Sequence, residues 1–270
     1  MSLVTTIATV VALPFMQAPS PHALSGNLTL VGDYRFRGLS QTYRQPAIQG
    51  GAEYGAVTGA YAGAWGSNVS GNQFLNGGSL ELDLYGGYRW SIGTGGIDVG
   101  AQYYWYPRAR YNIDPGDRYN TTELYLGVRY DRFTAKYSHA LSDLFGMKTR
   151  TIGGYCGVGA DGTPATTNCL GTGASTGSGY LDLLATFGAP KVLSVALHYG
   201  YQSVRRYERL SYSDYKIALA RALGPVTLGA AAVGTDAEAR FYRFAPTTAG
   251  SGETENVAKL GVVLSASRAF

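Results

Sequence analysis

Segments of about ten residues with two different faces dominate the sequence, and they recur along almost its whole length. Apolar side chains alternate with polar or small ones, and a strict period of two is typical of a β-strand whose faces meet different environments. Helical periodicity does not extend beyond a turn or two. The predicted strands lie near 27–37, 46–56, 58–67, 79–91, 96–107, 120–130, 133–142, 179–188, 192–202, 211–222, 225–235 and 256–270.

The connections between these segments alternate in length. Short connections fall at Val57 and near 93–95, 131–132, 188–191 and 224–225, and long ones at 38–45, 68–78, 108–119, 143–178, 203–210 and 236–255. In an up-and-down meander this places every long loop at one end, which is the asymmetry of outer-membrane barrels. We therefore predict an all-β fold, a transmembrane antiparallel up-and-down β-barrel of about 12 strands, formed by a single domain over residues 25–270.

The composition supports a barrel and argues against a nucleic-acid partner. The chain has 38 glycines, 22 tyrosines and 15% charged residues, as expected for a barrel with aromatic girdles. Its mean hydropathy of −0.07 is unremarkable because only alternate residues would meet lipid. The formal charge is +4, but no lysine-rich run or basic helical face forms a patch for nucleic acid.

Residues 1–24 are predicted to be a signal peptide. The apolar run 3–16 is too short to span a bilayer, and Pro19 and Pro21 follow it. No lysine or arginine precedes the run and no clear cleavage motif follows, so processing anywhere within 18–25 remains open.

Two cysteines, Cys156 and Cys169, lie in one loop rich in glycine, threonine and serine. In an exported protein such a pair can form a disulfide. Two thiols alone make a poor metal site, so a structural disulfide is favoured over zinc or redox chemistry, and no metal site is predicted.

The apolar rows could face either the inside of a soluble barrel or the lipid around a membrane barrel. Aromatic residues gather at strand ends on the apolar side, where membrane interfaces hold them: Tyr54, Trp90, Tyr103, Trp105, Tyr130, Tyr199 and Tyr201. The other side carries both signs of charge among many glycines, which suits a lumen. We predict a location in the bacterial outer membrane, and a soluble lipocalin-like barrel remains the minor alternative.

The polar side supplies the predicted pore-lining residues: Asp33, Arg35, Arg37, Glu53, Glu81, Asp83, Arg89, Asp98, Glu123, Arg129, Lys136, Asp182, His198, Asp214, Lys216 and Lys259. The two signs nearly balance, which predicts weak ion selectivity. These charges could brace a narrow barrel as a network of ion pairs, or form a constriction that selects ions, and the sequence does not separate the two.

An enzyme is the alternative from another class, because some outer-membrane barrels are lipases with serine and histidine on the lipid face. His139 falls on the apolar side of its strand, but Ser138 points the opposite way. No G-x-S-x-G motif or P-loop is present, so a structural role for His139 is favoured and no catalytic residue is predicted.

The loops and the last residue point to partners in the membrane. Loop arginines have planar forks that suit the phosphates of lipopolysaccharide: Arg44, Arg108, Arg110, Arg118, Arg150, Arg205, Arg206, Arg209, Arg240 and Arg243. Ordinary solvated loops remain the simpler interpretation for most of them. The last strand ends on Phe270, as in barrels whose terminal strand is read by the assembly machinery and closes against the first strand.

Several stretches resemble the TorF-type porin family of bacterial outer membranes. They are Asp33–Thr42 (DYRFRGLSQT), 46–51 (PAIQGG), 61–69 (YAGAWGSNV) and 80–88 (LELDLYGGY), followed by shorter matches as far as Gly234-Thr235-Asp236. The resemblance covers nearly the whole chain after the leader, but the chain departs from the family in the leader, in loop 143–178 and at Arg268.

The resemblance implies an outer-membrane barrel with a channel role, and it does not supply a substrate. We expect a monomer, without cofactor, that passes small hydrophilic solutes or ions by diffusion. Loop 143–178 is the candidate for a plug or lid. A closed structural or surface-binding barrel is the alternative.

Overall fold

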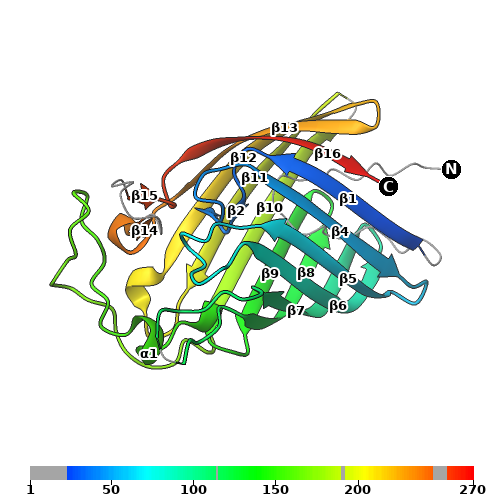
Figure 1. The fold of residues 1–270 in the computed structure, drawn as a ribbon. Helices are drawn as coiled ribbons and strands as arrows, with labels where there is room; N and C mark the ends of the chain where they lie inside the picture. The colour runs from blue at the N-terminus through cyan, green and yellow to red at the C-terminus, as the bar shows by residue number, and fades with distance from the viewer. Residues whose placement is uncertain (1–22, 114, 190–191, 246–253) are drawn as a thin grey trace.

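The computed structural model describes residues 23–113, 115–189, 192–245 and 254–270. Twelve antiparallel strands form a closed barrel in which each strand pairs with its neighbours in sequence (Figure 1). The first and last strands close the ring, with Leu28 opposite Arg268. The predicted antiparallel barrel of about 12 strands is therefore confirmed. The barrel strands are β1 (Ala23–Val31), β4 (Ala47–Gly55), β5 (Ala60–Asn68), β6 (Leu80–Ile92), β7 (Gly95–Trp105), β8 (Thr121–Tyr130), β9 (Phe133–Ala140), β10 (Gly179–Ala189), β11 (Leu193–Ser203), β12 (Tyr212–Leu223), β13 (Val226–Thr235) and β16 (Gly261–Ala269).

All predicted strands except the first and the last agree with the structure to within two residues at each end. The first strand is shifted, because β1 ends at Val31 and the chain then turns into the barrel instead of continuing to residue 37. The last strand is shorter than predicted, because residues 255–256 form the short strand β15 (Glu255–Asn256) and a turn precedes β16. Of the predicted leader, residues 1–22 lie outside the described residues, while Ala23 and Leu24 belong to β1.

Loop lengths alternate as predicted. The connections 56–59, 93–94, 131–132 and 224–225 are tight and lie at one end of the barrel, which we call the short-turn end. Gly93, Asp131 and Gly224 have positive φ at the first position of their two-residue turns, as right-twisted hairpins require. The longer connections 32–46, 69–79, 106–120, 141–178, 204–211 and 236–260 share the opposite end, the long-loop end.

The outer surface of the barrel is apolar, and this decides between the two orientations considered above. Side chains such as Leu84, Val99, Leu126 and Ile217 are exposed at mid-strand, and Tyr54, Trp90, Tyr130 and Phe133 are exposed near the short-turn end. An apolar belt edged by aromatic residues is the surface that a bilayer requires. The alternating positions, including Glu81 and Asp98, are buried inside. The arrangement is therefore that of a membrane barrel, not of a soluble one.

Loop 141–178 lies over the long-loop end together with residues 204–211, 236–245 and 254–260. Leu144, Leu170, Val204, Leu210 and Phe241 form one buried apolar cluster there. The short elements of this cover are η1 (Leu144–Gly146), α1 (Thr149–Ile152), η2 (Glu208–Leu210), η3 (Ala239–Phe241) and the pair β14 (Arg243–Phe244) with β15. Among the described residues, no helix is long and apolar enough to cross a membrane.

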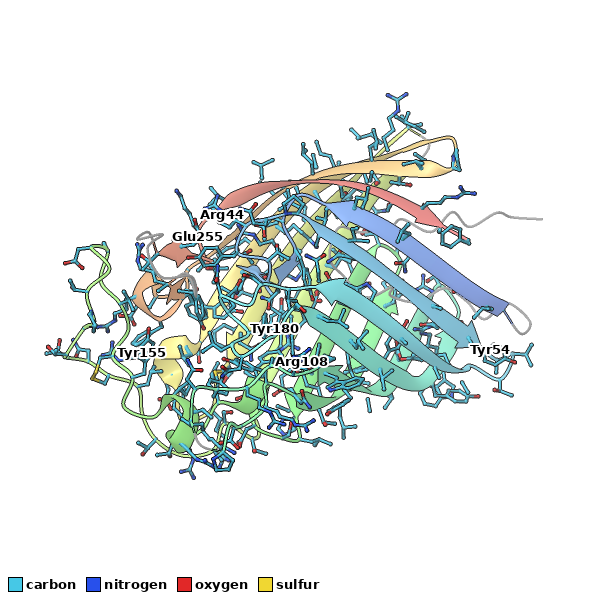
Figure 2. All side chains as sticks on the ribbon, in the orientation of Figure 1. Arg44, Tyr54, Arg108, Tyr155, Tyr180 and Glu255 are labelled. Atoms are coloured by element: carbon cyan, nitrogen blue, oxygen red, sulfur yellow. A yellow bond between two sulfur atoms is a disulfide. The ribbon has the colours of Figure 1, made fainter. Side chains whose placement is uncertain are left out.

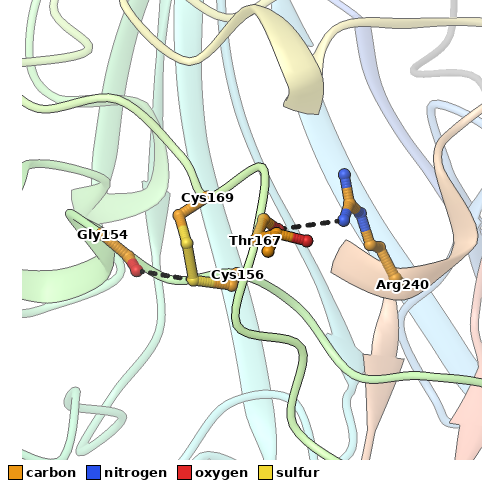
Figure 3. Close-up of a disulfide and its surroundings, with 5 residues drawn as sticks. All are labelled: Gly154, Cys156, Thr167, Cys169 and Arg240. Atoms are coloured by element: carbon orange, nitrogen blue, oxygen red, sulfur yellow. Dashed lines mark hydrogen bonds between the residues drawn. A yellow bond between two sulfur atoms is a disulfide. The ribbon is translucent and has the colours of Figure 1, made fainter.

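The predicted disulfide between Cys156 and Cys169 is present (Figure 3). Arg240 Nη1 donates to the carbonyl oxygen of Thr167 at 3.3 Å, so the loop that the disulfide closes is held against η3. The disulfide therefore stabilises the cover, outside the barrel strands.

Candidate functional site in the barrel lumen

Most predicted pore-lining residues lie on the inner faces of barrel strands. They are Glu53 on β4, Glu81, Asp83 and Arg89 on β6, Asp98 on β7, Glu123 and Arg129 on β8, Lys136 on β9, Asp182 on β10, His198 on β11, and Asp214 and Lys216 on β12. Lys259 is different: it is exposed in the bend before β16, because the strand begins only at Gly261. The assignment of Lys259 to the pore lining stays a prediction, because no barrel strand carries it.

Asp33, Arg35 and Arg37 are buried inside the barrel, but not on a barrel strand. They belong to residues 32–46, here called the inner segment, which folds into the ring of strands. Figure 1 shows β2 (Arg35–Phe36) within that ring, and it pairs with β3 (Leu39–Ser40) as a small hairpin. Polar and aromatic side chains alternate over residues 33–37, and this pattern predicted a barrel strand. The hairpin gives the same pattern because its short strands, β2 and β3, are also extended.

The inner segment is held in shape by its own side chains. The Asp33 carboxylate accepts hydrogen bonds from Ser40 Oγ at 2.6 Å and from Thr42 Oγ1 at 3.3 Å. Its other oxygen accepts one from Arg35 Nε at 2.6 Å. Arg35 Nη1 also donates to the carbonyl oxygen of Lys259 at 2.9 Å. The hairpin is therefore a small folded unit attached to the connection that precedes β16.

Arg37, at the tip of the hairpin, reaches the far wall of the lumen. Its Nη2 is 2.6 Å from Glu123 Oε2 on β8, which lies five strands round the barrel from β1. Its Nη1 donates to Gln202 Oε1 on β11 at 2.7 Å. The guanidinium also lies over the rings of Phe36, at 4.8 Å, and Tyr180, at 4.4 Å. One arginine thus connects the inner segment to two strands of the far wall, β8 and β11.

Gly38 lets the tip fit against the neighbouring wall. Its φ of 81° lies in the left-handed region that favours glycine. A Cβ at this position would lie 2.5 Å from Asp214 Cβ and 2.5 Å from Thr235 Cγ2, on β12 and β13. The hairpin tip therefore fills the lumen between β8 and β13.

A second charged cluster lies near the short-turn end. Arg89 binds both oxygens of Glu53, at 2.5 and 3.0 Å, and its Nε is 3.4 Å from Asp98. The guanidinium lies 3.6 Å from the ring centroid of Tyr61, whose hydroxyl donates to Asp98 at 2.6 Å. The Tyr61 hydroxyl also meets that of Tyr125. Arg89 therefore pairs with the buried carboxylate of Asp98 and the partly buried one of Glu53, and it packs on an aromatic ring.

A third cluster extends across β10–β12, with Lys136 of β9 beside it. His198 lies between two carboxylates, with Nε2 3.2 Å from Asp182 and Nδ1 3.4 Å from Asp214. Tyr180, visible inside the barrel in Figure 2, donates to Asp214 at 2.9 Å. Lys136 pairs in register with Asp182, and Lys216 with His198. Lys136 and Asp182 therefore set opposite charges face to face on neighbouring strands.

Glu81 and Asp83 differ from these clusters because no ion pair joins either of them to a cation in the described part of the chain. Tyr106 donates to Glu81 at 2.9 Å, and the Gln102 side-chain amide donates to Asp83 at 3.0 Å. Burial raises the pKa of Tyr34 and of Tyr106 well above that of a free phenol, so both hydroxyls stay protonated beside these carboxylates. Glu81 and Asp83 are therefore buried acidic side chains of the wall that are held by neutral donors.

Side chains fill the lumen toward the long-loop end. Glu81 is 0% exposed, and Tyr34 and Tyr104 are each 2% exposed. Phe145 of the cover packs edge-on against Phe36 at 5.9 Å and Tyr104 at 5.7 Å. Loop 143–178 thus contributes a lid-like cover and one aromatic side chain, whereas the segment that plugs the lumen is 32–46.

Inward tyrosines are the lumen residues to which the sequence analysis assigned no role. A Cβ at Gly63 would lie 2.5 Å from the Tyr85 ring, and one at Gly100 would lie 2.6 Å from the ring of Tyr125. Each glycine stands directly opposite its tyrosine on the next strand. Each glycine leaves room for the ring of the tyrosine opposite it, so the ring lies flat along the wall. A glycine paired with a tyrosine on the next strand is therefore the sequence signal that could have identified these residues.

The residues considered for hydrolysis lie on opposite faces of β9. Ser138 is buried toward the lumen and His139 is exposed on the outer surface. Within the described ranges, no group of three or more histidine, cysteine or acidic residues is placed to hold a metal ion.

Comparison with solved structures agrees with the fold. The NanC porin aligns at 9% identity with a TM-score of 0.50, covering 91% of this chain and 98% of that one. The KdgM porin aligns at 8% identity and 0.49, covering 91% and 99%. An outer membrane channel from Pseudomonas putida F1 aligns at 12% identity and 0.46, covering 96% and 100%. No curated protein sequence matches.

A family model described as "Bacterial protein of unknown function (Gcw_chp)" matches residues 16–267. This span includes the whole inner segment and every barrel strand except the last two residues of β16. The chain therefore belongs to the Gcw_chp family.

Proposed function

We propose that this protein is a porin-like channel of the bacterial outer membrane, of the TorF type, through which small hydrophilic solutes or ions diffuse. The observation that carries the proposal is the inverted barrel: an apolar belt outside and a wall of paired charges inside. A charged wall is expected where water and polar solutes enter the lumen and contact the wall. The porin fold of the NanC neighbour is consistent with it.

The proposal includes the partners expected of such a barrel. The signal peptide would be removed before β1, which starts at Ala23. Phe270 continues the pairing with β1 through its backbone N–H, which donates to the carbonyl oxygen of Gly26 at 2.9 Å. The assembly machinery is proposed to read this terminal strand. Exposed arginines such as Arg108, Arg205 and Arg206 at the long-loop end would meet lipopolysaccharide phosphates. The molecule is proposed to act as a monomer.

A closed structural or surface-binding barrel is the second candidate, and one observation favours it. The inner segment and Phe145 fill the lumen toward the long-loop end with buried side chains. A barrel that stayed in this conformation would have a structural or surface-binding role and would not pass solute.

Conductance in a planar bilayer separates the two candidates. Refolded protein is expected to produce discrete current steps, and a protein-free detergent sample is the control. The absence of any step at every applied voltage, for protein that shows the mobility shift of a folded barrel, would defeat the channel.

Incubation of the same preparation with phospholipid is expected to leave the lipid intact, and release of fatty acid would instead favour the hydrolase.

The unpaired acidic side chains predict the ion preference of the open channel. Because Glu81 and Asp83 lack ion-pair partners among the described residues, the conducting lumen is expected to prefer cations modestly. Replacing both by Glu81→Gln and Asp83→Asn is expected to move the reversal potential in a KCl gradient toward zero. Glu238→Gln, in the cover and half-exposed, is the matched control. An unchanged reversal potential would place the ion path away from these two side chains.

A further inference from the structure

We propose that the inner segment is a gate that can leave the lumen, and that Arg37 is the latch that holds it closed. The inference rests on the proposed channel function, because only a conducting barrel can be gated. A movable gate would explain why a barrel with a charged interior has a lumen that is filled in this conformation.

The position of the inner segment makes it an obstruction. It starts at the end of β1, and its tip contacts β8 and β11 through Arg37 and β12 and β13 through Gly38. The tip therefore crosses the lumen from one wall to the others. Solute moving along the barrel axis would have to displace it.

The inner segment keeps its shape through internal contacts, and it is anchored at Ser40, whose N–H donates to the carbonyl oxygen of Val257 at 2.9 Å. Its hairpin pairing and the Asp33 hydrogen bonds to Ser40 and Thr42 lie within the segment itself. Withdrawal of the tip would leave these contacts intact. Arg44 at its far end pairs with Glu255 at 3.3 Å, in the half-exposed surface at the long-loop end that Figure 2 shows.

Arg37 supplies the contacts that tie the tip to the wall. The Arg37 and Glu123 side chains are 6% and 3% exposed, so each charge depends on the other for compensation. Gln202 satisfies a second edge of the guanidinium, and the Phe36 and Tyr180 rings lie against its faces. Separation of this pair would require both charges to be rehydrated, which water in an opened lumen provides. The closed and open states are therefore two discrete arrangements.

The first test removes the latch without leaving a buried charge. In the double variant Arg37→Met/Glu123→Gln, the open probability in planar bilayers is expected to rise roughly tenfold or more, with the conductance of each open step unchanged. The single variants are expected to gate like the double one, because each already breaks the same pair. Arg132→Met, which removes an exposed arginine outside the inner segment, is the control and is expected to gate like the wild type. Gating of the double variant at the wild-type rate would overturn the latch.

A second readout does not depend on current. Trypsin is expected to cut folded Arg37→Met/Glu123→Gln after Arg35 at least several-fold faster than it cuts the wild type, because withdrawal exposes this bond. Heat-modifiable gel mobility checks that the barrel is folded, and Arg37→Gln/Glu123→Gln, which also removes both charges, is used in its place if it is not. Equal cleavage rates in folded wild type and variant would count against a movable segment.

Deletion of residues 33–45 with a short glycine-serine replacement separates failure of the gate from failure of the channel. A folded deletion variant that conducts continuously, beside a wild type that is mostly closed, supports the gate. A deletion variant that carries no current defeats the proposed channel itself. A deletion variant that conducts while Arg37→Met/Glu123→Gln stays closed refutes Arg37 as the latch.

Discussion

Replacing Arg89 by methionine is expected to destabilise the folded barrel by about 3–5 kcal/mol, the cost of removing one partner from a buried ion pair. Arg89 is 12% exposed and neutralises Glu53 and Asp98, which are 14% and 4% exposed. Methionine keeps the length of the side chain but leaves both carboxylates without their cation. The free energy of unfolding in urea, measured in lipid vesicles by tryptophan fluorescence, gives the change.

Two controls make this result specific. Arg132→Met removes an exposed arginine whose pairing with Asp131 is in solvent, and little measurable change is expected. Arg89→Met/Glu53→Gln removes one of the two stranded charges and is expected to recover part of the loss. If Arg89→Met were as stable as the wild type, the cluster at the short-turn end would be hydrated and would not brace the wall.

The strands, and the faces of most of them, were predictable because alternation is a rule that holds within ten residues. The predicted strand 58–67 is the exception, because small and aromatic residues alternate there and neither face is polar. Leu84 and Asp83 differ by one position, so alternation alone assigns one to lipid and the other to the interior. Loop lengths then fixed the topology, and the spacing of Cys156 and Cys169 in one loop indicated their bond. None of these inferences needs contacts between distant parts of the chain.

The interior of the lumen could not be predicted in the same way, because its contacts join residues far apart in sequence. Arg37 and Glu123 are separated by 86 positions, and no local pattern relates them. Residues 33–37 alternate like a barrel strand, and only Gly32 marks the place where the chain leaves the sheet. Loop 143–178 was the candidate plug or lid, as a long loop that the expected disulfide would stiffen. The shorter segment 32–46 occupies the lumen, and its hairpin satisfies many of its own polar groups.

The orientation of the barrel leads to a second large effect, at the outer surface. Leu126 is 52% exposed at the middle of β8, within the apolar belt. Leu126→Arg is expected to lower the free energy of unfolding by about 2–4 kcal/mol in a bilayer, because a guanidinium at the midplane must leave water or thin the membrane. The same urea titration in lipid vesicles measures it.

Depth is the variable that this experiment isolates. Leu24→Arg is the comparison variant, because Leu24 lies on the same outer face but at the short-turn end of β1. There an arginine costs about 0–1 kcal/mol and can extend its head group to the interface. The chain already carries Arg268 on the outer face near that end, with its guanidinium 5.6 Å from the Phe270 ring centroid. A Leu126→Arg variant as stable as Leu24→Arg would mean that no hydrocarbon covers the middle of the belt. The charged interior would then have no reason to be a path for solutes, since water would be equally available outside.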